Sequence, residues 1–182
     1  MPTRTLPVIA CQVKDESGEK TIIALATVSE AQLSGLSPRQ IVGQLIQPST
    51  TDLIESTNFA RNPAFVEFMH DVIQRHGPSL PDLQAAARSQ LEGHVFIIDG
   101  RTPSPEGPVP PEDIVGGFQV HKGLLDVSTY SANPNHRLLS DRGFAQLDSG
   151  LVELLQAEAS QPPFQAARLT PVGTEKPWYK FW

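Results

Sequence analysis

Residues 99–113 constrain the fold of this chain more than any other segment. Five prolines lie between Pro103 and Pro111, and short apolar runs flank the segment at residues 95–98 and 114–115. Proline fixes φ and has no N–H group to donate, so the segment can form neither the interior of a helix nor a central strand. We therefore expect a rigid, exposed connection between two buried strands of one sheet, rather than a linker between two domains.

The length and composition predict one globular domain. The chain has 182 residues, of which 39% are hydrophobic and 19% charged, a balance typical of a folded protein. A chain of this length can bury a sizeable core, and no internal repeat divides it. We expect a single domain over residues 1–182, with residues 161–182 as a proline-rich and aromatic C-terminal tail.

Charge and cysteine content exclude several classes of protein. The formal net charge is −6, and the Lys and Arg residues do not cluster, which argues against nucleic-acid binding. The single cysteine, Cys11, excludes an internal disulfide and a multi-cysteine zinc site, and its strand-like surroundings predict a buried structural residue. Neither a signal-peptide pattern nor an apolar run of about 20 residues is present. The sequence thus predicts a cytoplasmic protein that needs no cofactor and no membrane.

Hydrophobic periodicity predicts both strands and helices. Residues 6–14 pair with 20–28 in one expected β-hairpin, and residues 114–121 pair with 124–130 in a second. Residues 94–99 are expected to form a strand at the centre of the sheet, because its core is continuously apolar. The order ββ-ααα-βββ-α indicates an α+β domain with a mostly antiparallel sheet of about five strands covered by helices.

Capping patterns indicate where the helices begin. Residues 37–40 (Ser-Pro-Arg-Gln) combine an N-cap serine, a proline at the first helical position and a glutamine at the third, and predict a helix that Pro48 ends. Residues 62–63 and 79–82 begin the second and third helices in a similar way, and residues 148–149 provide the cap of the last helix.

Glycines predict special backbone geometry within the second hairpin. Gly116 and Gly117 lie inside an expected strand, which indicates a bulge or the close approach of another part of the chain. Gly123 lies between the two strands, where it can supply the positive φ that a tight hairpin turn needs.

The C-terminal tail contains both tryptophans of the chain, Trp178 and Trp182, together with Tyr179. These rings either fold back over one face of the sheet, since aromatic side chains dominate core burial, or form an exposed anchor for a partner. The first explanation is favoured, because monomers rarely leave so large an apolar patch in water.

Two histidines on the second expected helix do not form a metal site. His70 and His76 lie six residues apart, which places them about 240° apart around the helix axis. A zinc-binding pair on a helix needs a spacing of four residues. We expect His70 to be an ordinary histidine on the helix surface.

Polar residues gather at two places that the fold could bring together. Asp99 and Arg101 follow a buried strand, while Asn135, His136 and Arg137 lie in a polar loop. The arginines could bind an anion or a carboxylate, and a histidine beside a carboxylate could act as a general base. Ordinary turn chemistry, in which these groups bond their own backbone and nearby acids, explains the same pattern and is favoured.

Two functions follow from these features. We expect a small non-enzymatic protein-binding module of the adaptor, inhibitor or immunity-protein type, because no phosphate-binding loop, nucleophile elbow or zinc-protease motif is present. Its negative charge suits a basic protein partner. The alternative is a small enzyme or ligand-binding domain with a polar pocket between the 99–101 turn and the 133–137 loop, which requires Asp99, Arg101 and His136 to converge. A homodimer joined through the sheet or the tail is a third possibility.

Overall fold

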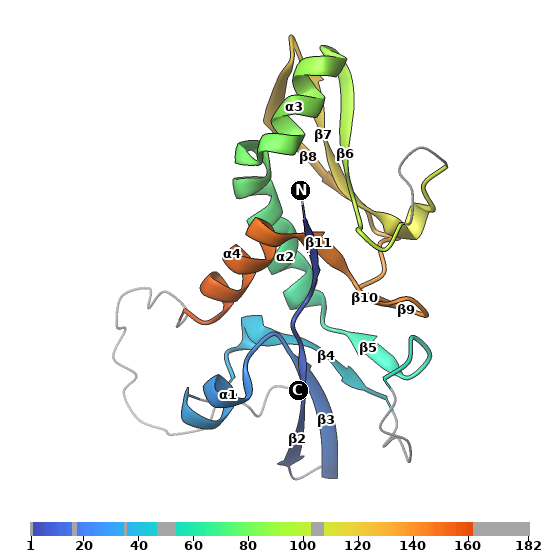
Figure 1. Cartoon of the computed structure of the whole chain (residues 1–182). Helices are drawn as coiled ribbons and strands as arrows, with labels where there is room; N and C mark the ends of the chain where they lie inside the picture. The colour runs from blue at the N-terminus through green and yellow to red at the C-terminus, as the bar shows by residue number, and fades with distance from the viewer. Residues whose placement is uncertain (1, 16–17, 35, 47–53, 103–107, 162–182) are drawn as a thin grey trace, which may run out of the picture.

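Most strands of the chain lie in two antiparallel sheets (Figure 1). One sheet has the order β2 (Ile9–Asp15), β3 (Gly18–Ala24), β4 (Ile41–Leu45) and β5 (Phe59–Arg61). The other has the order β6 (Gly93–Ile98), β7 (Ile114–His121) and β8 (Leu124–Ala132). The computed structural model describes residues 2–15, 18–34, 36–46, 54–102 and 108–161.

Short strand pairs and helices complete the described part of the chain. β1 (Thr3–Thr5) pairs with β11 (Gln146–Asp148), and β9 (Leu139–Ser140) pairs with β10 (Gly143–Phe144). The α-helices are α1 (Val28–Ser34), α2 (Pro63–His76), α3 (Pro81–Gln90) and α4 (Ser149–Ala159), and short 3-10 turns lie at Pro38–Gln40, Gly77–Ser79 and Pro111–Asp113. The predicted α+β class is confirmed.

Helix α2 runs between the two sheets and joins them (Figure 1). The β6–β8 sheet, with α3 packed on it, forms one end of an elongated molecule, and the β2–β5 sheet with α1 forms the other. One buried apolar cluster extends from Ile23 in β3 through Met69 in α2 to Phe118 in β7. Side chains of both sheets therefore share one core, and α2 is its central element.

Both predicted hairpins are confirmed. β2 pairs with β3, and β7 pairs with β8 through a turn in which Lys122 has φ 52° and Gly123 has φ 76°. Positive φ at both turn residues matches the right-handed twist of the flanking strands. Two of the expected helix caps form: Asn62 accepts a hydrogen bond from the N–H of Ala64, and Asp148 accepts one from the N–H of Gly150. The cap expected at residues 79–82 is wrong, because α3 begins after Leu80 with no side-chain cap hydrogen bond.

The helix predicted to begin at residues 37–40 is wrong. The capping box does form, since the N–H of Ser37 donates to Gln40 Oε1 at 2.8 Å, but it closes only one 3-10 turn. The chain then becomes extended and continues as β4, which pairs with β3. Val42 of this strand is fully buried. The apolar residues 41, 42, 45 and 46 fit either period, and the β-branched pair Ile41-Val42 fits a strand better.

The central position predicted for residues 94–99 is also wrong, as is the single sheet of about five strands. The order β6-β7-β8 places β7 in the centre and β6 at an edge. The apolar run of β6 alternates rather than being buried throughout: Val95 and Ile97 face the core, whereas Phe96 is 53% exposed. The apolar run is continuous because Phe96 is apolar but exposed, and β6 is therefore buried on one face only.

Other differences are smaller. The strand expected to reach residue 28 ends at Ala24, and Val28 begins α1. Cys11 is half-buried rather than buried. Residues 103–107 of the proline-rich segment and residues 162–182 of the tail lie outside the described residues. No helix in the described part of the chain is long and apolar enough to cross a membrane.

Candidate functional site

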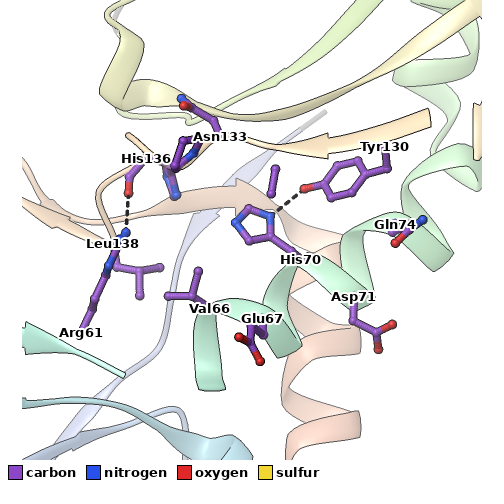
Figure 2. Close-up of a pocket in the computed structure, with 12 residues that line it drawn as sticks. Arg61, Val66, Glu67, His70, Asp71, Gln74, Tyr130, Asn133, His136 and Leu138 are labelled. Atoms are coloured by element: carbon purple, nitrogen blue, oxygen red, sulfur yellow. Dashed lines mark hydrogen bonds between the residues drawn. The ribbon is translucent and has the colours of Figure 1, made fainter. Parts of the chain in front are cut away.

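A pocket of about 510 Å³ opens between α2 and the end of β8 with the loop that follows it (Figure 2). Helix α2 forms one wall, and residues 130–138 form the other, with Arg61 of β5 at one end. The same helix buries Phe65, Met69 and Ile73 in the core. His70 lies at the edge of this buried stripe, so the amphipathic pattern of α2 places its ring in the pocket.

His70 is held by a tyrosine from the opposite wall. Its Nδ1 lies 2.7 Å from Tyr130 Oη (Figure 2). Burial lowers the pKa of His70 to about 4, and the positive charge of Arg61 adds to this effect, as does that of His136 in its protonated form. Burial also raises the pKa of Tyr130, so the phenol keeps its proton. The neutral imidazole therefore accepts at Nδ1 and carries its own proton on Nε2.

A glycine makes room for Tyr130. A Cβ atom at Gly116 would lie 2.7 Å from Tyr130 Oη and 2.8 Å from the carbonyl oxygen of Ser131. The tyrosine ring also packs against Phe118, with a centroid distance of 4.9 Å. The close approach predicted at Gly116-Gly117 is thus confirmed, and it serves to place a pocket residue.

His136 is held from behind by a buried carboxylate. Its Nε2 lies 3.1 Å from Asp99 Oδ2, and both side chains are buried. Burial by itself would raise the pKa of Asp99, but hydrogen bonds from His136, Arg101 and Gln146 outweigh it and lower the pKa below its usual value. An ionised carboxylate only accepts, so His136 Nε2 carries a proton; in the neutral form of the ring, the lone pair is then on Nδ1.

The free nitrogen of His136 faces the pocket. No described residue bonds to its Nδ1, yet no buried side-chain nitrogen or oxygen among the described residues lacks a hydrogen-bond partner. The Nδ1 atom thus has no partner among the described residues, and His136 lines the pocket although its side chain is only 2% exposed. Each of the two histidines thus uses one nitrogen on a protein partner and leaves the other free.

Arg101 has a structural role and no donor left for a ligand. Its Nε and Nη2 donate to Asp99, at 3.0 and 2.7 Å. Its remaining N–H groups donate to Ser140 Oγ at 2.9 Å, to the carbonyl oxygen of Gly143 at 2.7 Å and to that of Arg137. All five N–H groups of the guanidinium are used. Arg101 thus pairs with a nearby acid, as in the explanation that the sequence favoured.

The other predicted site residues are placed apart from this pair. Asn135 and Arg137 are exposed and do not line the pocket. Arg137 contributes its carbonyl oxygen to Arg101, and Asn135 donates its N–H to Asn133 Oδ1 at 3.1 Å. Trp178, Tyr179 and Trp182 lie outside the described residues. Asp99, Arg101 and His136 are the members of the predicted set that converge.

Arg61 is the one lysine or arginine side chain in the described lining of the pocket. Arg61 reaches the backbone carbonyl of His136 at 3.3 Å, and its charge acts on His70. Two carboxylates of α2 also belong to the lining, but Figure 2 shows Glu67 and Asp71 pointing away from the His70 ring. Asp71 is neutralised by Arg75 at 2.9 Å. Arg61 is therefore the group of the pocket that could attract a small anion.

A second buried carboxylate secures the far end of the proline-rich segment. Arg142 forms a bidentate pair with Asp113, at 2.7 and 2.6 Å, and the hydroxyl of Thr102 donates to Asp113 at 2.8 Å. The N–H of Asp99 also bonds the carbonyl oxygen of Asp113 at 2.8 Å. Both described ends of the segment are thus tied together beside the Asp99–His136 pair.

Sequence reasoning missed three residues of the pocket. His70 was expected on the helix surface, which is wrong, and Arg61 and Tyr130 were not considered. Tyr130 lies 60 positions from its partner His70. The sequence holds one signal for Tyr130: the predicted hairpin places it near Gly116, a glycine that leaves room for the tyrosine side chain.

Metal binding and similarity to known proteins give no further information on the site in the described part of the chain. Within the described residues, no three His, Cys, Asp or Glu side chains lie close enough together to hold a metal ion. No family model, curated protein or solved structure matches the chain.

Proposed function

We propose that this protein binds a small organic anion in the pocket between His70 and His136. One observation carries the proposal: two histidines from opposite walls line the same pocket, and each ring is tied to a described residue through one of its two nitrogens. Such convergent, preorganised polar groups are typical of ligand-binding sites.

The lining favours a carboxylate with a short apolar part. His70 offers a neutral N–H donor, and Arg61 offers a guanidinium that can pair with a carboxylate. Between them, Val66 and Leu138 provide apolar surface. The volume of about 510 Å³ lies in the usual range for small-molecule sites.

This proposal develops the ligand-binding alternative that the sequence raised. That alternative required Asp99, Arg101 and His136 to converge, and their contacts support it. The protein-binding function rests on the proline-rich segment and the aromatic tail, and it stays a prediction because residues 103–107 and 162–182 lie outside the described residues.

Titration with benzoate tests the proposal. The imidazole nitrogen resonances of the ¹⁵N-labelled full chain are followed as benzoate is added. We expect saturable changes at His70 and His136, with the exposed His121 unchanged. His70→Leu should abolish the saturable change, because it removes the N–H donor and keeps an apolar side chain.

A neutral ligand provides the matched comparison. Methyl benzoate has the same ring without the negative charge, so it should bind at least tenfold more weakly if the pocket selects anions. Equal affinity for the two ligands, or no change at either pocket histidine with benzoate, phosphate or pyruvate, would overturn the proposal.

A further inference from the structure

The free nitrogens of His70 and His136 have opposite properties. His70 Nε2 carries a proton and donates when Nδ1 accepts from Tyr130, whereas His136 Nδ1 has a lone pair and accepts when the ring is neutral. We propose that the pocket catalyses proton transfer at the carbon next to the carbonyl of a 2-oxo carboxylate, with His136 as the general base. This inference rests on the proposed function, because it assigns an activity to the same pocket.

The surroundings of His136 suit a base. Asp99 accepts its Nε2–H at 3.1 Å, which keeps the lone pair on Nδ1. When Nδ1 takes up a proton, the resulting imidazolium lies against an ionised carboxylate that stabilises it. The ring is buried apart from the pocket, so a ligand in the pocket is the group that can meet Nδ1.

The surroundings of His70 suit an electrophile. The ring is neutral at physiological pH, since its pKa is about 4. It can therefore stabilise a developing negative charge on oxygen through Nε2–H without losing the proton. Tyr130 holds the ring at the other nitrogen, so the donor is oriented before a ligand arrives.

Three contacts of a 2-oxo acid match the three free groups. Its carboxylate can pair with Arg61, its keto oxygen can accept from His70 Nε2–H, and the C–H beside the keto group can face His136 Nδ1. The pocket lining contains no Ser, Thr, Cys or Lys among the described residues. It thus lacks the serine, threonine, cysteine and lysine nucleophiles that are common in covalent catalysis, which favours proton transfer.

The proposed step conserves atoms and electrons. The C3 proton moves to His136 Nδ1, and the C–H electron pair forms a C2–C3 double bond. The π pair of the keto group moves to oxygen, and the enolate accepts a hydrogen bond from His70. The imidazolium exchanges its proton with solvent through the pocket and returns one to C3, so no further reactant is consumed.

Hydrogen–deuterium exchange of pyruvate tests the inference. The full chain is incubated with pyruvate in D₂O, and the loss of the methyl signal is followed by proton NMR. We expect exchange that saturates with pyruvate and is at least tenfold faster than with the same concentration of free imidazole. His136→Gln should remove this acceleration, and His70→Leu should reduce it at least tenfold.

A matched control uses a histidine far from the pocket. His121 is exposed, pairs with Glu92 and lines no part of the site, so His121→Gln should exchange pyruvate as fast as the unaltered protein. Circular dichroism checks the fold of each variant. If His136→Gln does not fold, His70→Leu is the variant that tests the inference. Exchange in that variant at the rate of the unaltered protein would overturn the inference.

The outcomes separate the two proposals. Saturable binding of pyruvate at the pocket histidines without accelerated exchange would overturn the base role and leave the proposed function standing. Neither binding nor exchange would overturn both. Full exchange in folded His136→Gln would also overturn the inference, because the base would then lie elsewhere.

Discussion

At the scale of single residues, Asp99 holds the polar part of the site together. Its carboxylate accepts from the side chains of Arg101 and His136 and from the backbone N–H of Gln146. These partners come from the turn after β6, the loop after β8 and strand β11. One carboxylate therefore fixes three segments around the free nitrogen of His136.

Replacement of Asp99 should be severely destabilising. Asp99→Asn leaves the guanidinium of Arg101 buried without a counter-charge, and we expect the free energy of unfolding to fall by about 3–5 kcal/mol. Urea denaturation followed by circular dichroism measures the loss. Asp113→Asn is the matched control, because Asp113 is also buried but its partner Arg142 is 41% exposed and can return to water. Equal losses in the two variants would contradict the expectation.

The sequence indicates the Asp99–His136 side of this pocket but not the His70–Tyr130 side. Asp99 and His136 attract notice as a carboxylate and a histidine beside predicted strand ends, and they do meet. The contact between His70 and Tyr130 depends on how α2 packs against β8, which no local pattern records. For Arg101 the sequence shows a positive charge, but it does not show the five acceptor atoms that bind the guanidinium in the fold.

At the scale of elements, Asn62 connects β4 to α2. Its N–H donates to the carbonyl oxygen of Val42 at 2.9 Å, and its Nδ2 donates to that of Ile41 at 2.8 Å. Its Oδ1 accepts from the N–H of Ala64 as the cap of α2. The start of the helix that carries His70 is thus bonded directly to the neighbouring sheet.

Loss of this connection should be measurable. Asn62→Ala removes the cap and leaves the carbonyl of Ile41 without its donor, so we expect a loss of about 1–2 kcal/mol in the free energy of unfolding. Asn62→Asp keeps the cap acceptor and removes only the donor, and it should lose less. Urea denaturation of both variants compares the two contributions. If Asn62→Asp were at least as damaging as Asn62→Ala, the cap would not be the main contribution.

The success of element prediction depended on how local the signal was. The caps at Asn62 and Asp148 are satisfied by neighbours in the chain, and both helices begin where expected. The capping box at Ser37 forms as well, yet the next residues become strand β4. Pairing with β3 and burial of Val42 decide that segment, and both are long-range interactions.

At the scale of the whole molecule, the arrangement of strands could not be predicted from their order. The apolar runs locate most strands, but they do not show that β6–β8 form a sheet separate from β2–β5. Helix α2 lies between the sheets and contributes to the core they share. The pocket exists because the same helix also faces β8 and the loop after it, so the site is a product of this division into two sheets.

The ionisable groups of the folded molecule predict that acid destabilises it. Hydrogen bonds lower the pKa of Glu158 through Arg75 and His76, and those to Asp99 lower its pKa despite burial. Stability from these carboxylates is present above their unfolded pKa and is lost at lower pH, when they take up protons. His70 acts in the same direction at higher pH, because its pKa falls from 6.5 to about 4 on folding.

The contribution of His70 can be isolated by comparison with His70→Leu. Between about pH 6.5 and 4 the unfolded chain binds a proton at this histidine that the folded chain does not, so the free energy of unfolding falls as the pH falls. We expect a loss of about 1–2 kcal/mol from this group, since its ring is partly exposed. Urea denaturation at about pH 7, 5.5 and 4 measures this loss. As the pH falls, the free energy of unfolding of the unaltered protein should decrease by this amount relative to that of His70→Leu. A difference that is independent of pH would show that His70 is not held neutral by the fold, and it would remove the basis for His70 as a neutral donor in the pocket.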